Sequence, residues 1–204
     1  MSQNEARRPG HIVVAWWRAL HPDEDGGGDR AAAARLRRAN TLHDVMVVPE
    51  AMLLHRRLCE AMGCERMSAE RFEIFSSAVA IIAGVLAAVK PGADGNVGDN
   101  TASFAAVLGR TAEGKRPGES ERPLYSSLRF ASLLRASDPE DRLRHLRRAA
   151  AQIRARGFDV VRFADDMLNW KDEARRRWIF QYHQQGRAAP QDTDTHRIEK
   201  RTVQ

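Results

Sequence analysis

The sequence predicts an all-α protein built from two small helical bundles. Apolar residues recur at three- and four-residue spacing along most of the 204-residue chain, and runs of β-branched residues are few. Segments containing Gly, Pro and Asp separate these periodic stretches, as expected for connections between helices. The chain is long enough for one domain or two small ones, and its 43% apolar content is ordinary for a folded protein.

The first half of the chain is expected to contain four helices. Ile12, Trp16 and Leu20 recur at four-residue spacing in the first of them. Asp29 can cap the second, and Pro49 stands where the third begins. The expected helices cover residues 11–20, 30–39, 50–62 and 69–89.

The helix over residues 69–89 is expected to lie at the centre of the first bundle. Ser68 can cap it, and from Ala78 onward it is apolar on all sides, which is typical of a helix surrounded by others. The segment 41–48 is ambiguous, because its valines also suit a short strand. The helical signals on both sides of it favour an irregular link between helices.

A Gly-rich segment divides the two predicted bundles. Residues 91–100 contain three glycines and one proline, which favours a linker. Asp138, Pro139 and the acids after them form a strong helix start. The predicted helices of the second half cover residues 101–110, 124–134, 139–156, 161–170 and 172–184. The predicted domains are residues 1–92 and 101–186, followed by a polar, disordered tail over residues 187–204.

Positive charge is concentrated in the second half of the chain. Residues 101–204 carry 21 of the 33 Lys and Arg residues but 14 of the 27 Asp and Glu residues. Only four of the 33 basic residues are Lys, and the planar guanidinium of Arg suits phosphate oxygens. This asymmetry favours a polyanionic partner, although a GC-rich genome also explains the preference for Arg.

The sequence shows no arrangement of residues typical of an enzyme or a metal site. It lacks a Gly-rich phosphate loop, a nucleophile elbow and a zinc-protease motif, and its seven histidines are scattered. Cys59 and Cys64 are too few for a disulfide framework or a four-ligand zinc site. We therefore expect no catalysis, no cofactor and no metal. We also expect two reduced thiols, no membrane association and a cytoplasmic location.

Arginines gather on one side of the helix predicted over residues 139–156. Leu143, Leu146, Ala150 and Ile153 recur at helical spacing and mark its buried side. At 100° per residue, four arginines fall away from that side, where they can engage successive phosphates: Arg144, Arg147, Arg148 and Arg154. Arg129 and Arg135 precede them, and Arg175 follows on the last helix. A solvated face without a ligand explains such a charge run equally well.

The aromatic residues indicate the mode of binding. Proteins that bind single strands often stack bases on exposed aromatic rings. Here the aromatic residues sit mainly at apolar helical spacings, which favours core packing: Trp16, Trp17, Phe130, Trp170, Trp178 and Tyr182. We therefore expect the protein to contact phosphates and not bases. Its affinity for nucleic acid should fall steeply with salt and depend weakly on base sequence.

Several short segments stand out when they are taken in order over roughly residues 12–184. They are Trp16-Trp17-x-x-Leu20, Ala34 to Ala39, Val48-Pro49, Leu108-Gly109-Arg110, Ser127-x-Arg129-Phe130-x-x-Leu133-Leu134, Leu143-x-x-Leu146-Arg147-Arg148, and Leu168-x-Trp170 through Arg177-Trp178. Together these segments resemble the CasB family, the small subunit of the type I-E CRISPR Cascade complex. The segments 23–28 and 111–123 and the end of the chain have no clear family counterpart. The pair Asp172-Glu173 also departs from the family, in which a basic residue often follows the tryptophan.

The resemblance implies a non-catalytic subunit of an antiviral surveillance complex. Its partners would be guide RNA, target DNA, the large and backbone subunits of Cascade, and a second copy of itself. It would help to hold the RNA–DNA heteroduplex and the displaced strand of the R-loop. The family's basic residues fall on Arg38, Arg135 and Arg148, with Arg147 beside the last. Together with the charge pattern, this predicts a nucleic-acid-binding set of Arg38, Arg135, Arg144, Arg147, Arg148 and Arg175.

Two other functions remain open from the sequence. An autonomous helical DNA-binding regulator would need a recognition helix that reads base edges from its N-terminal end. Asn169 and Gln152 lie toward helix C-termini, which argues weakly against it. A structural adaptor would use its uneven charge for protein contacts alone.

Overall fold

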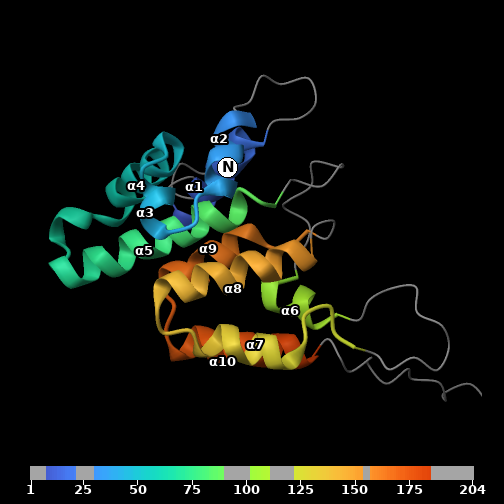
Figure 1. Cartoon of the computed structure of the whole chain (residues 1–204). Helices are drawn as coiled ribbons and strands as arrows, with labels where there is room; N and C mark the ends of the chain where they lie inside the picture. The colour runs from blue at the N-terminus through green and yellow to red at the C-terminus, as the bar shows by residue number, and fades with distance from the viewer. Residues whose placement is uncertain (1–7, 22–29, 90–101, 111–121, 154–156, 185–204) are drawn as a thin grey trace, which may run out of the picture.

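The computed structural model describes residues 8–21, 30–89, 102–110, 122–153 and 157–184 (Figure 1). Within these ranges the chain forms ten α-helices and one short 3-10 helix and contains no β-strand. The predicted all-α class is confirmed. The expected Gly-rich linker, the expected disordered tail and Arg154 lie outside the described residues.

The first half follows the predicted order of helices with two short additions, the helix α3 (Leu42–Met46) and the 3-10 helix η1 (Cys64–Arg66). The segment 41–48 forms a short helix, in which the Thr41 hydroxyl accepts from the Asp44 amide and the Asp44 carboxylate accepts from the Thr41 amide. This reciprocal capping stabilises a turn too short to stand out in the apolar pattern. The elements are α1 (Pro9–Leu20), α2 (Arg30–Arg38), α3 (Leu42–Met46), α4 (Pro49–Met62), the 3-10 helix η1 (Cys64–Arg66) and α5 (Ala69–Leu86).

The second half contains the five predicted helices, with boundaries shifted by a few residues. Asp138 caps α8 by accepting from the Asp141 amide at 3.1 Å, with Pro139 in the first turn, as the start signal predicted. The elements are α6 (Phe104–Gly109), α7 (Ser127–Arg135), α8 (Pro139–Gln152), α9 (Val160–Leu168) and α10 (Asp172–Gln184).

Helix α5 lies at the centre of the molecule, as its apolar sequence predicts. Ser68 caps it by accepting from the Arg71 amide, and every residue from Ala78 to Leu86 is buried. In Figure 1, α3 and α4 lie on one side of α5, and α8 and α9 lie on the other. This one helix therefore packs against both halves of the chain.

Helix α1 also packs across the two halves, against α9. Gly10 permits the close approach, because a Cβ on Gly10 would lie 2.5 Å from Cγ1 of Val161. The buried apolar residues of both halves form a single hydrophobic cluster. The division into domains 1–92 and 101–186 stays a prediction, but the described helices of the two regions share this core.

A smaller interface holds α10 against α6 and the segment before α7. Gly109 faces the backbone of Tyr182, and Ser103 Oγ donates to Gln181 Oε1 at 2.7 Å. The Tyr182 hydroxyl donates to the Tyr125 carbonyl oxygen, and its ring stacks on Phe130 at 4.0 Å between centroids. These contacts fix the position of α7 relative to α10.

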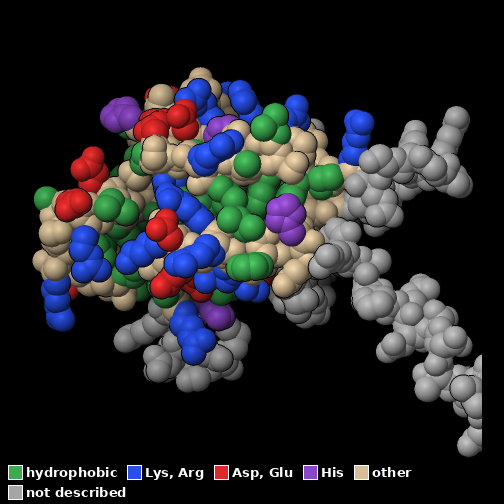
Figure 2. All heavy atoms as spheres, turned by 90° about the horizontal axis from the view of Figure 1, so that it is seen from below, with side chains coloured by type: hydrophobic (Ala, Val, Ile, Leu, Met, Phe, Trp, Pro, Cys, Tyr) green, Lys and Arg blue, Asp and Glu red, His purple; other side chains and the backbone are tan. Residues whose placement is uncertain are grey.

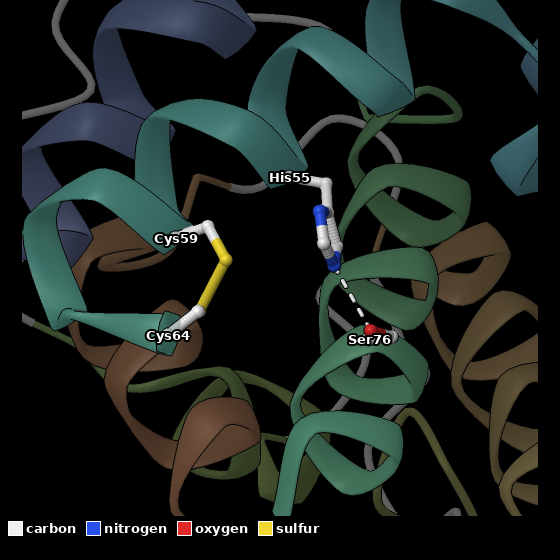
Figure 3. The surroundings of a disulfide bond; sticks show 4 residues. All are labelled: His55, Cys59, Cys64 and Ser76. Carbon is white, nitrogen blue, oxygen red and sulfur yellow. Dashed lines mark hydrogen bonds between the residues drawn. A yellow bond between two sulfur atoms is a disulfide. The ribbon is translucent and has the colours of Figure 1, made fainter. Parts of the chain in front are cut away.

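Cys59 and Cys64 form a disulfide at the end of α4 (Figure 3). The expectation of two reduced thiols is therefore wrong for this structure. Gly63 adopts a left-handed conformation, with φ 67°, which turns the chain so that Cys64 returns toward Cys59. One turn before Cys59, His55 Nε2 lies 2.9 Å from Ser76 Oγ of α5, and burial lowers the pKa of His55.

Candidate nucleic-acid interface

The predicted buried side of α8 is confirmed, which fixes where its arginines lie. Leu143, Leu146, Ala150 and Ile153 are all buried. Arg144 and Arg148 are exposed on the other side. Arg144 forms an ion pair with Asp141 one turn earlier, and its side chain remains 62% exposed.

Arg147 does not lie on the exposed side, and its predicted outward position is wrong. Its guanidinium enters the junction of α2, α5 and α8, where each nitrogen donates to a backbone carbonyl. Nε donates to Gly84 at 3.1 Å, Nη2 donates to Leu36 at 2.8 Å, and Nη1 donates to Ala39. Burial lowers the pKa of Arg147. This arginine joins three helices and is not presented to an outside phosphate.

Gly84 explains why Arg147 can turn inward. A Cβ at position 84 would lie 2.9 Å from Nη2 of Arg147 and 3.0 Å from a methyl carbon of Leu143. The absence of a side chain in the middle of α5 therefore leaves space for the guanidinium. The helical spacing of α8 alone does not show this space, because it belongs to a different helix.

A groove of about 440 Å³ lies between α7 and α8 and carries two of the arginines. Arg129 of α7 and Arg148 of α8 both line it, and none of its lining residues is an Asp or a Glu. The lining is part apolar and part polar: Tyr125, Leu128, Arg129, Ser132, His145, Arg148, Ala151 and Gln152.

The titratable groups of the groove show its electrostatics. Burial raises the pKa of the Tyr125 hydroxyl, while the charges of Arg129 and Arg148 act in the opposite direction. Burial lowers the pKa of His145, and the charges of Arg148 and Arg144 lower it further. Both shifts keep the tyrosine and the histidine uncharged at neutral pH. The positive charge of the groove therefore comes from its two arginines.

The other predicted arginines lie apart from this groove. Arg38 ends α2 and Arg135 ends α7, and both are exposed. Arg175 is half-buried in α10, where its Nη1 donates to Asp172 Oδ1 at 3.2 Å. Of the six predicted residues, only Arg148 lines the groove.

Sequence reasoning did not single out the groove, although a signal for it exists. Residues three or four apart share one face of each helix. On the first helix these are Leu128 and Arg129 with Ser132, and on the next they are His145, Arg148 and Gln152. Two such faces on consecutive helices with a short connection face each other when the helices pack as a hairpin. Leu128, which is 74% exposed, reads as an ordinary surface leucine without that pairing.

The prediction that the aromatic residues pack in the core is confirmed for five of the six. Those buried are Trp16, Trp17, Phe130, Trp178 and Tyr182. Trp170 is half-buried beneath the guanidinium of Arg142, 5.7 Å from its ring centroid. Asp166, which reads as a surface acid, is buried, and it accepts from Trp178 Nε1 at 2.6 Å and from Arg177.

On the face seen from the side of α7 and α10, basic and acidic side chains alternate with exposed apolar ones (Figure 2). In the described residues, no three His, Cys, Asp or Glu side chains are grouped so that they could hold a metal ion. No described helix is both long enough and apolar enough to span a membrane.

A family model supplies the identity of the chain. The model of the CRISPR-associated protein Cse2 matches residues 32–183, a range that includes all six predicted arginines and the groove. No curated protein and no solved structure matches the chain. The matched range covers about three quarters of the sequence and agrees with the segments that resemble the CasB family. The chain therefore belongs to the CRISPR-associated protein Cse2 family, the CasB small subunits of type I-E Cascade.

Proposed function

We propose that this chain is a non-catalytic subunit of Cascade that binds guide RNA and target DNA through their phosphates and helps to hold the R-loop. Membership of the Cse2 family makes the chain a subunit of a CRISPR complex. The single observation that carries the finer proposal is the groove between α7 and α8. Arg129 and Arg148 are the charged residues of its lining, which contains no carboxylate.

The chemistry of the groove suits a nucleic-acid backbone. Guanidinium groups bind phosphate oxygens with two parallel hydrogen bonds, and a backbone contact carries no information about base sequence. Exchanging a DNA duplex for an RNA–DNA hybrid is nearly balanced in energy. A few phosphate contacts on a rigid helical surface are therefore enough to favour the open R-loop on any target.

In this role the chain catalyses no reaction. It acts in the cytoplasm, where it binds the other Cascade subunits and a second copy of itself. Arg38, Arg135 and Arg144 remain candidates for additional phosphate contacts, because their side chains are exposed. Arg147 is left out, because its donors already serve the carbonyls of α2 and α5.

A salt titration of binding tests the groove. The double variant R129Q/R148Q removes both groove charges, and R56Q/R57Q removes two exposed charges from α4 as a matched control. Binding of single-stranded DNA is measured by fluorescence anisotropy over a range of salt concentrations. We expect the slope of log K against log salt to become shallower by about 1.4 for the groove variant, since each phosphate contact contributes about 0.7.

Two outcomes would contradict the proposal. Equal loss of affinity in both double variants would show attraction by net charge alone, without a role for the groove. A strong preference for one of two unrelated DNA sequences would favour an autonomous regulator that reads bases. The wild-type chain should bind both sequences with the same affinity and the same salt slope.

A further inference from the structure

Two arginines at one corner of the molecule have hydrogen-bonding capacity that the chain leaves unfilled. Arg142 lies in α8, just after the α7–α8 connection, and Arg175 lies in α10, just after the α9–α10 connection. The Nε atoms of both are buried without a hydrogen-bond partner among the described residues. Nε1 of Trp170, the residue on which Arg142 stacks, is unpartnered as well. Three unsatisfied N–H donors at one place are unusual, because buried donors are generally paired.

The guanidinium of Arg142 is held by neutral acceptors. Nη2 of Arg142 donates to the backbone oxygens of Ala136 and Ser137, at 3.3 and 3.2 Å, and these are neutral acceptors. No Asp or Glu of the described residues forms an ion pair with Arg142. Burial and the neighbouring charge of Arg175 lower the pKa of Arg142 to about 10, against a smaller opposite effect of Asp138. At neutral pH Arg142 therefore remains charged, and the neighbouring charge of Arg175 repels it.

An outside group can reach this pair through Arg175. Its Nη1 binds Asp172 of the same helix, and 33% of its side chain is exposed. Arg142, by contrast, is held by the carbonyls at the end of α7 and by the face of Trp170. Arg142 is therefore fixed in place, and the partly exposed side chain of Arg175 is the part of the pair that an outside anion can contact.

We propose that the pair Arg142 and Arg175 receives one carboxylate, an Asp or Glu side chain of another protein subunit of the complex. A single carboxylate bound at the exposed part of Arg175 places a negative charge beside both guanidinium groups. A nucleic-acid strand fits less well, because Asp138 and Asp172 lie beside the two arginines and repel the many charges of a polyanion more strongly than the one charge of a carboxylate. The groove between α7 and α8 has no such acids in its lining. Arg175 thus changes from an expected phosphate contact to a protein contact.

Assembly of the complex tests this site separately from nucleic-acid binding. The variant R175Q removes the accessible charge, R175E reverses it, and R176Q is the matched control, an exposed arginine one residue further along α10. Each full chain is mixed with the remaining purified Cascade subunits and guide RNA, and incorporation is measured by native mass spectrometry. We expect R175Q to be incorporated at least tenfold more weakly, R175E not at all, and R176Q like the wild type.

Each result decides the question. Full incorporation of R175E would overturn the proposal. Loss of DNA affinity by isolated R175Q, with normal assembly, would identify a phosphate as the ligand and would also overturn the proposal.

If a thermal melt shows that R175Q is unfolded, anion binding by the wild-type chain is measured by NMR instead. The ¹⁵Nε–H signals of Arg142 and Arg175 should then shift when sodium acetate replaces sodium chloride, and unchanged signals would reject the site. The inference rests on the proposed function as a subunit of a multisubunit complex. Assembly tests the Arg142–Arg175 site and DNA binding tests the groove, so either proposal can fail while the other holds.

Discussion

Arg147 belongs to the predicted charged face of α8, but its side chain forms hydrogen bonds inside the protein. It stands next to Arg148 in a basic run, but it donates to carbonyls of α2 and α5, while Arg148 faces the groove. Adjacent residues on a helix point about 100° apart, so the two arginines meet different surroundings. Charge alone therefore does not separate a structural arginine from a binding one.

Replacing Arg147 with Met should destabilise the fold by about 3 kcal/mol, because buried carbonyls lose their donors. The matched change R144M, on the exposed side of the same helix, should alter the free energy of unfolding by no more than about 0.5 kcal/mol. Urea denaturation of both variants, followed by circular dichroism, measures the difference. If R147M were as stable as R144M, the three hydrogen bonds from Arg147 to carbonyls would contribute nothing to the free energy of unfolding.

At the scale of elements, small residues decide which helices can touch. A Cβ on Gly109 would lie 2.0 Å from the Tyr182 carbonyl oxygen, so α6 and α10 meet at their backbones. Gly10 has the same role between α1 and α9. Gly10 lies in the first turn of α1, and Gly109 is the last residue of α6. Close approach of a second helix is the physical reason for their presence.

The variant G109A should therefore be destabilised, although Ala favours a helix more than Gly does. A backbone atom cannot move aside as a flexible side chain can, so α10 must shift, and we expect a loss of about 2 kcal/mol or more. The control E173A removes an exposed side chain at the start of α10 and should leave the melting temperature nearly unchanged. A melting temperature of G109A equal to or above that of the wild type would contradict the close backbone contact.

At the scale of the whole molecule, the two halves are joined by buried interfaces. Helix α5 of the first half contacts α8 and α9 of the second, and α1 packs on α9. Arg147 adds hydrogen bonds across the same boundary, and Glu140 of α8 accepts from the Leu42 amide of α3 at 2.9 Å. The groove and the Arg142–Arg175 corner both use α8, so their relative position is set by this shared core.

The whole chain should accordingly unfold in one cooperative transition. Separating the halves would expose buried residues of α1, α5 and α9 to water, which makes a half-folded state unfavourable. Differential scanning calorimetry should give equal calorimetric and van't Hoff enthalpies. Two resolved transitions would show that residues 1–92 and 101–186 are independent folding units.

The sequence alone indicated the nine longer helices of the described ranges and the family, but not the short helices α3 and η1. Apolar spacing, the caps at Ser68 and Asp138, and the turn at Gly63 depend on residues close together in the chain, so local physical chemistry predicts them. The core position of Trp178 and the exposure of Arg148 also follow from helical spacing.

Only the tertiary structure decided which arginines share a site. The inward turn of Arg147 depends on Gly84, 63 residues away, and the groove depends on how α7 packs against α8. The pairing of Arg142 with Arg175 likewise arises where two separate helix connections meet. A guanidinium has the same charge in all three surroundings. The neighbours brought by distant segments determine whether it joins helices, lines the groove or lies beside a second guanidinium, and local sequence patterns do not specify those neighbours.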